Sequence, residues 1–149
     1  MRREVGEAPF SVKMADPDNS ESLLMPKTTA AAALAKITKL CAALPEAKRE
    51  LMGSHAAFTV RGKKFAYLLD NHHGDGILAL CFRGAPGEQQ AWIELDDKRY
   101  FSPAYIGPRG WTGLRLDIGA TNWSEVEARI VSSYRIAAPR TLAAKLEAK

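Results

Sequence analysis

The sequence predicts an α+β protein in which helices cover an antiparallel β-sheet built from hairpins. Three observations indicate this class. Alternating apolar runs flank glycine-containing turns, apolar residues recur at helical spacing before and after these runs, and successive strand patterns lie close together in the chain. Strands joined by short turns pair antiparallel, because a parallel connection needs a dozen or more residues.

The composition is that of one globular domain. A chain of 149 residues, 46% hydrophobic and 26% charged, can bury a core without disulfides or a structural metal. No apolar run approaches the roughly 20 residues that span a bilayer, and the first residues lack the apolar stretch of a secretory signal. We therefore expect a cytoplasmic protein that does not bind membranes.

The first 25 residues differ from the rest of the chain. They are polar, contain Pro9 and Pro17, and show no helical or strand periodicity. They also carry more acidic than basic side chains, although the whole chain has a net charge of +4. We expect a disordered tail over residues 1–25 and a single, more basic domain over residues 26–149.

The first helix is predicted shortly after Pro26. Thr28 or Thr29 can cap its start, and Pro45 stops it. Apolar residues recur at nearly helical spacing between these positions, at Leu34, Ile37, Cys41 and Leu44. This apolar face should pack on the sheet.

A tight hairpin follows in "AAFTVRGKKFAYLL". Phe58 and Val60 alternate before Gly62, and the alternation continues after it. "ILALCF", residues 77–82, is apolar throughout and predicts a third, central strand. "RGAPGEQQAW" then begins a second helix, with Pro86 in its first turn and Glu88 at the positive end of the helix dipole, ending near Leu95.

"YFSPAYIGPRGWTGLRLD", residues 100–117, has aromatic and apolar residues on both sides of Gly-Pro-Arg-Gly. It predicts a second hairpin with residues 107–110 at its tip, so that Arg109 projects from the hairpin end. Asn122 and Glu125 then have the spacing of a capping box. The helix that follows shows one apolar face, and a short terminal helix begins at Pro139.

Four segments together resemble the MmcQ/YjbR family of small bacterial proteins. They are "FTVRGKKFAYLL", "HHGDGILALCFRGAPGEQ", "YFSPAYIGPRGWTGLRLD" and "WSEVEARIVSSYRIAAP", and the resemblance covers roughly residues 30–146. It implies a CyaY-like α+β fold. It also implies DNA binding, because the hairpins of this family look like a double wing.

The charges give a separate reason to expect DNA as a partner, bound with low sequence specificity. Arg61, Lys63 and Lys64 surround the first hairpin turn, and Arg109 lies at the second. Lysine and arginine neutralise phosphates and release counterions, which gives affinity with little base readout. Further basic residues could extend this surface: Lys98, Arg99 and Arg115. The alternative is that charges at exposed turns only keep the protein soluble.

Two aromatic residues fit either of two roles. Trp111 and Tyr105 could stack on the bases of an opened strand or pack in the core beside the sheet. An exposed apolar patch around them would favour the alternative function, a non-catalytic module that binds a protein or a small ligand.

No pattern indicates an enzyme, and we expect no catalytic residue, metal or cofactor. His72 and His73 are adjacent and have no third ligand at a patterned distance. Cys81 lies in an apolar strand without a paired histidine, so we expect it, like Cys41, to be a buried free thiol. The turn in "RGAPGEQ" lacks the lysine and hydroxyl of a nucleotide-binding loop.

Overall fold

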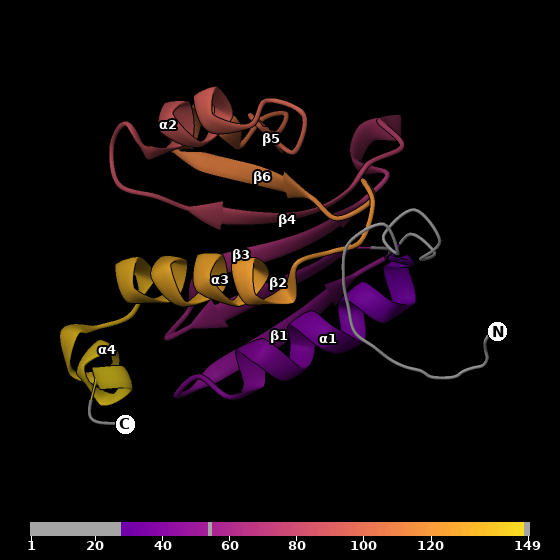
Figure 1. Ribbon diagram of the computed structural model, residues 1–149. Coiled ribbons are helices and arrows are strands. Elements are labelled where there is room, and N and C mark those ends of the chain that lie inside the picture. Colours follow the sequence, from indigo (N-terminus) through magenta and orange to yellow (C-terminus); the bar gives the residue numbers. More distant parts are fainter. Residues whose placement is uncertain (1–27, 54, 148–149) are drawn as a thin grey trace, which may run out of the picture.

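The computed structural model describes residues 28–53 and 55–147 (Figure 1). These residues form a six-stranded antiparallel sheet in the order β1-β2-β3-β4-β6-β5, with helices packed against it, which confirms the α+β class. The predicted tail, residues 1–25, lies outside the described residues. The elements are α1 (Ala30–Ala42), β1 (Ala47–Met52), β2 (His55–Val60), β3 (Lys63–Asp70), η2 (His72–Gly74), β4 (Leu78–Arg83), α2 (Glu88–Leu95), β5 (Tyr100–Phe101), η3 (Gly107–Arg109), β6 (Trp111–Arg115), α3 (Trp123–Ala137) and α4 (Arg140–Glu147).

The main core lies between one face of the sheet and helices α1 and α3, which cross that face (Figure 1). Ile37 of α1 and Ile130 of α3 are fully buried against Phe58, Leu80 and Leu114 of the strands. Helix α2 packs on the far edge of the sheet, against β5 and β6. No helix of the described residues is long and apolar enough to cross a membrane.

The first hairpin has the predicted strands and turn. Val60 pairs with Lys63 across a two-residue loop, and both loop residues are left-handed, with φ of 50° at Arg61 and 81° at Gly62. Two positive φ angles are what a type I′ turn requires, and its twist matches that of the strands on either side.

The sequence analysis missed β1, which pairs with β2 along its whole length. The strand reads AKRELM and is exposed from Lys48 to Met52. It forms one edge of the sheet, so neither of its sides needs a regular apolar pattern, and its charges discourage pairing with another chain.

The second hairpin is looser than predicted. β5 has only two residues, and residues 102–110 form a long connection to β6 that carries the turn η3. Arg109 therefore lies in a 3-10 turn rather than at a tight hairpin tip. β5 packs closely on β6 at Gly113. The ring of Phe101 in β5 occupies the space that a side chain at Gly113 would need, with its Cε1 atom 2.5 Å from an ideal Cβ.

Two helix starts also differ in detail from the prediction. Gly87, with φ of 89°, precedes α2, so Pro86 lies in the turn before the helix rather than in its first turn. Asn122 caps α3 as expected, by accepting hydrogen bonds from the backbone N–H of Ser124 and Glu125. The carboxylate of Glu125 does not close a capping box, because it is bound to Arg99 and Tyr100 instead.

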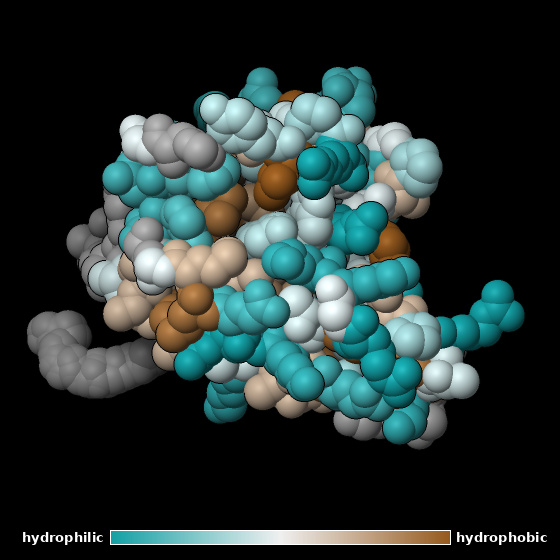
Figure 2. All heavy atoms as spheres, turned by 180° about the vertical axis from the view of Figure 1, so that it is seen from behind, coloured by the Kyte–Doolittle hydropathy of each residue, from teal (hydrophilic) through white to brown (hydrophobic). Residues whose placement is uncertain are grey.

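A second, smaller apolar cluster covers the opposite face of the sheet. Trp111 is only 7% exposed and packs with Leu69 and Cys81, and its ring centroid lies 4.8 Å from that of Tyr67. The Trp111 ring is thus a core group and has no free face for a base. Figure 2 shows the molecule from this side, with its apolar surface divided into separate patches among polar residues.

The buried hydroxyl group of Ser133 forms hydrogen bonds between α3 and the sheet. Ser133 Oγ accepts a hydrogen bond from the backbone N–H of Arg83 (2.8 Å) and donates one to the carbonyl of Phe65 (2.5 Å). These bonds join the helix to β3 and β4 at one end of the sheet, and Ser133 is fully buried there.

We predict that Ser133→Ala lowers the free energy of unfolding by about 2 kcal/mol, because it leaves buried backbone groups without their partner. Ser132→Ala, at the exposed neighbouring position of α3, is the matched control and should change it by less than about 0.5 kcal/mol. Urea denaturation of the two variants measures the difference. Equal stability of the two would contradict this role.

Candidate nucleic-acid interface

The register of the sheet brings the two predicted basic turns to the same end. Ala66 of β3 pairs with Phe82, and Arg83, the last residue of β4, pairs with Trp111, the first of β6. The turn at Arg61 and the turn that carries Arg109 therefore lie beyond the same ends of their strands. This geometry was not evident from sequence spacing.

Basic residues gather at this end, which we call the basic end. It includes the predicted Arg61, Lys63, Lys64 and Arg109, together with residues from β1, β4, α3 and α4 that the sequence analysis did not select. The additional basic residues are Lys48, Arg83, Arg135, Arg140 and Lys145, and the acidic residues described at this end are Glu46 and Glu88.

The opposite end of the sheet is predominantly acidic, and we call it the acidic end. Three of the predicted DNA-binding residues, Lys98, Arg99 and Arg115, lie there. They therefore do not extend the surface around Arg109. The acidic residues of this end are Asp70, Asp75, Asp96, Asp97, Asp117 and Glu125.

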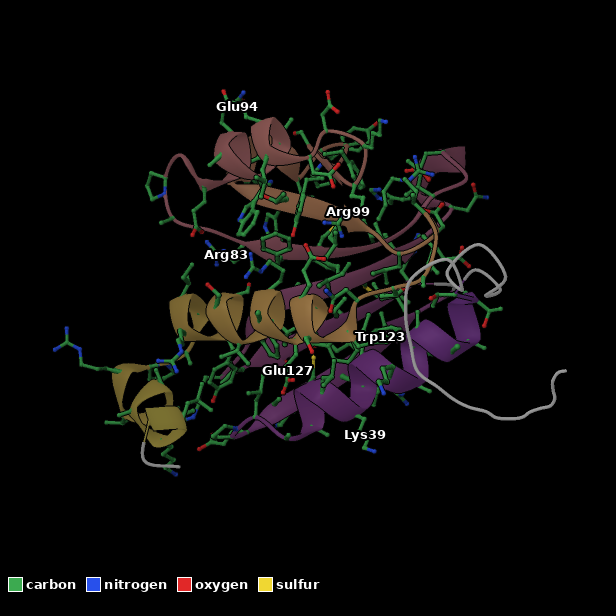
Figure 3. The ribbon with its side chains drawn as sticks, in the orientation of Figure 1. Lys39, Arg83, Glu94, Arg99, Trp123 and Glu127 are labelled. Atoms are coloured by element: carbon green, nitrogen blue, oxygen red, sulfur yellow. The ribbon has the colours of Figure 1, made fainter. Side chains whose placement is uncertain are left out.

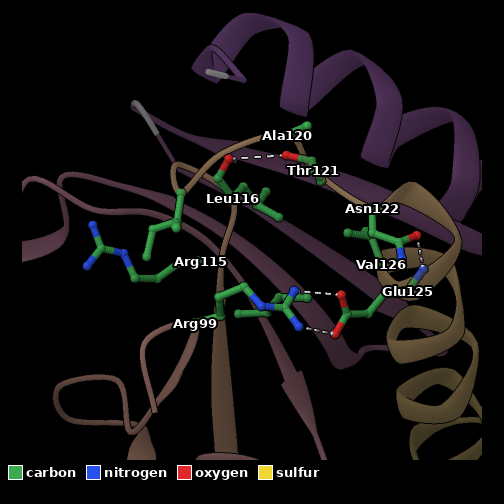
Figure 4. Close-up of a pocket in the computed structure, with 10 residues that line it drawn as sticks. Arg99, Arg115, Leu116, Ala120, Thr121, Asn122, Glu125 and Val126 are labelled. Carbon is green, nitrogen blue, oxygen red and sulfur yellow. Dashed lines mark hydrogen bonds and ion pairs between the residues drawn. The ribbon is translucent and has the colours of Figure 1, made fainter. Parts of the chain in front are cut away.

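Arg99 is occupied by an internal ion-pair cluster. Its guanidinium binds both carboxylate oxygens of Glu125, at 2.7 and 3.1 Å (Figure 4). It also binds Asp96, at 2.8 Å. Tyr100 donates a short hydrogen bond to the same Glu125 carboxylate. The cavity beside this cluster has a volume of about 10 Å³, which is room for about one water molecule. The cluster is therefore structural rather than a ligand site.

Burial raises the pKa of Glu125, but hydrogen bonds from Arg99 and Tyr100 lower it by more, so its pKa lies below the usual value. The ionised carboxylate is thus the form that the fold favours. Arg115 forms a similar bidentate pair with Asp117. In Figure 4 the Arg99 guanidinium reaches across to Glu125 on α3, while Arg115 points away from it.

The predicted residues at the basic end are more available. Arg61 pairs with Glu46 at 2.6 Å, but both side chains are about half exposed, and such pairs contribute little and open easily. Lys63 and Arg109 are exposed and Lys64 is half-buried. Within residues 28–53 and 55–147, none of these three forms an ion pair with a carboxylate.

A groove of about 500 Å³ opens at the basic end. Its two walls are the turn between β4 and α2, residues 83–87, and the turn of residues 107–110, so Arg83 and Arg109 both line it. Gln89 joins the walls, because its Nε2 donates to the carbonyls of Gly107 and Trp111. Figure 3 shows Arg83 toward one end of the sheet and Arg99 toward the other.

Arg83 lies against the smaller apolar cluster. The Arg83 guanidinium lies over the Trp111 ring, 5.7 Å from its centroid. Burial is the main cause that raises the pKa of Tyr67, and the positive charge of Arg109 opposes that rise. Sequence analysis missed Arg83, although its place immediately after an apolar strand is the signal for a residue at a sheet end.

The histidine and cysteine side chains form no metal cluster in the described part of the chain. The fold does bring His55 next to His72, with ring centroids 5.4 Å apart, and His55 Nδ1 accepts a hydrogen bond from the backbone N–H of Asp70. Cys41 and Cys81 are buried free thiols, as predicted. Burial raises the pKa of Cys41 to about 12 and raises that of Cys81 further.

The fold and this site define a small α+β protein with helices on one face of an antiparallel sheet and a cationic groove at one end. A model of the YjbR family matches residues 42–136, so the chain belongs to the YjbR family, as its sequence resemblance predicted. A search of curated proteins finds no match.

A solved structure is similar in fold. The crystal structure of Deinococcus radiodurans protein DR2400, described with the family-model domain DUF419, matches with a TM-score of 0.57 and 15% sequence identity. The match covers 69% of this chain and 76% of that chain. At this identity the similarity shows the fold alone.

We predict that the ion pair and hydrogen bond of Glu125 with Arg99 and Tyr100 make the free energy of unfolding depend on pH in the acid range. Since the pKa of Glu125 is lower in the folded protein than in the unfolded chain, its stabilisation is present above the unfolded value of about 4.3 and is lost as the pH falls through the folded value. Glu125→Gln should therefore be less stable than the parent protein at pH 7, and this difference should shrink toward pH 3.

Urea denaturation of the parent protein and of Glu125→Gln at both pH values checks this prediction. Glu127→Gln, at an exposed position of the same helix, is the control. A stability difference between parent and Glu125→Gln that does not change with pH would show that the ionised carboxylate has no special role.

Proposed function

We propose that the protein binds DNA with low sequence specificity, through phosphate contacts made by the basic end of its sheet. The observation that carries the proposal is the separation of charge along the strands, which leaves Lys63, Lys64 and Arg109 exposed or half-exposed and without carboxylate partners among the described residues. DNA presents a dense row of phosphates, and cationic side chains that approach it release condensed counterions.

The contact groups also support low specificity. Lys63, Lys64 and Arg109 lie on or beside turns, and lysine and arginine contacts to phosphate fix position without reading the sequence. The groove lined by Arg83 and Arg109 adds two guanidinium groups, and guanidinium binds phosphate in a bidentate manner.

The acidic end supports one orientation of binding. Asp96, Asp97 and Asp117 lie there, and like charges repel the phosphate backbone. A duplex near this protein is therefore attracted to the basic end and kept from the opposite one.

We predict that labelled duplex DNA binds the parent protein in a salt-dependent manner, and that charge reversal of Lys63, Lys64 and Arg109 to glutamate removes most of this binding. The slope of log K against log salt should fall by about one for each lost phosphate contact. Fluorescence anisotropy at two salt concentrations measures both quantities.

Single substitutions give the matched control. Arg109→Glu and Lys98→Glu each change one exposed cation in a turn by the same charge, at opposite ends of the sheet. Arg109→Glu should weaken DNA binding by about tenfold, and Lys98→Glu by much less. Equal effects of the two substitutions would overturn the proposed surface, and no binding at low salt would overturn the proposed function in favour of a protein- or small-ligand-binding module.

A further inference from the structure

Tyr105 lies at the apex of a strained turn within residues 102–110. The backbone N–H of Ile106 donates to the carbonyl of Ala104 at 2.8 Å, which closes a three-residue turn around Tyr105. The φ angle of Tyr105 is 70°. A γ-turn whose central residue has positive φ is rare and strained, and a side chain makes it more so.

The surrounding contacts hold this strained conformation in place. Gly107 N–H donates to the Pro103 carbonyl at 2.7 Å, and Arg109 N–H donates to the Ile106 carbonyl at 2.9 Å. The Ile106 side chain packs against the apolar cluster of Trp111. Strain that the surrounding structure maintains in this way is characteristic of functional positions.

The residue at the apex of this turn is an exposed aromatic residue. Tyr105 is 75% exposed, and among the phenylalanine, tyrosine and tryptophan residues that the structure describes, it alone falls in the exposed class. The sequence left base stacking and core packing open for both Trp111 and Tyr105. In the structure Trp111 packs in the core and Tyr105 is exposed.

The Tyr105 backbone lies in the same connection as one of the cations proposed to hold phosphates. Arg109 follows four residues later in the same connection, so their Cα atoms lie at most about 14 Å apart. Arg109 in turn shares its groove with Arg83. An exposed aromatic ring beside cations that track a backbone is the arrangement that binds single-stranded nucleic acid, in which unpaired bases stack on the ring.

We propose that Tyr105 stacks on an unpaired base of a nucleic-acid strand whose phosphates contact Arg109 and Arg83, so that the protein prefers single-stranded segments to fully paired duplex. This inference rests on the proposed nucleic-acid binding. Electrostatics alone would favour the duplex, which has the higher charge density. A preference for the single strand therefore requires a contribution from the bases themselves.

The test compares a labelled oligothymidine, the oligouridine of equal length and a duplex of equal length, by anisotropy at low salt. Tyr105→Ala should weaken binding of the single strands by about 5- to 100-fold and change duplex binding by less than about twofold. Tyr105→Trp should retain single-strand binding. If Tyr105→Ala loses affinity for oligothymidine only, the stacked base comes from DNA; if it loses affinity for oligouridine only, the base comes from RNA. Loss with both means that either strand can supply the base.

Tyr105→Gly keeps the test independent of folding. Glycine adopts positive φ without strain, so this variant should melt about 2–4 °C higher than the parent protein and yet lose single-strand binding like Tyr105→Ala. Unchanged single-strand binding in both variants, with binding still lost on charge reversal of Lys63, Lys64 and Arg109, would overturn the stacking role and leave the proposed function intact. Absence of binding to all three probes would overturn both.

Discussion

The antiparallel register of β3, β4 and β6 decides which charges of this protein share a surface. Because Arg83 pairs with Trp111, the turn that carries Arg109 lies beyond the same sheet end as the turn at Arg61. The same register sends Arg99 and Arg115 to the opposite end. The two groups of cations are far apart for a simple reason: they occupy the two ends of the same strands.

Helix α3 is bonded to the sheet at both of these ends, by an ionised carboxylate at one and by a neutral hydroxyl at the other. Glu125, in its first turn, binds Arg99 and Tyr100 through an ionised carboxylate. Ser133, two turns later, bonds to the backbone of Arg83 and Phe65 through a buried hydroxyl. The helix is therefore bonded to the end of β4 and the start of β3, next to the groove that Arg83 lines.

Much of the fold could be predicted from local pattern, because alternation around Gly62 and helical spacing around Ile130 reflect burial directly. Strand β1 could not, since an exposed edge strand has no burial to report. The site was predictable in part. Arg109 and the lysines beside Gly62 follow from turn chemistry, whereas the separation of Arg99 from Arg109 depends on which residues begin a hairpin and which lie at its tip. Net charge carries no information on that point, whereas the hairpin predicted over residues 100–117 already separates its start from its tip.

The distribution of charge along the strands also gives the molecule an electric dipole. In the field of a polyanion such a dipole experiences a torque, so the molecule turns its basic end forward before any contact forms. This orientation acts only within the Debye length, about 10 Å at 0.1 M salt. At low ionic strength the same dipole lets two copies attract one another head to tail, with the Arg109 end of one facing the Asp96 end of the next.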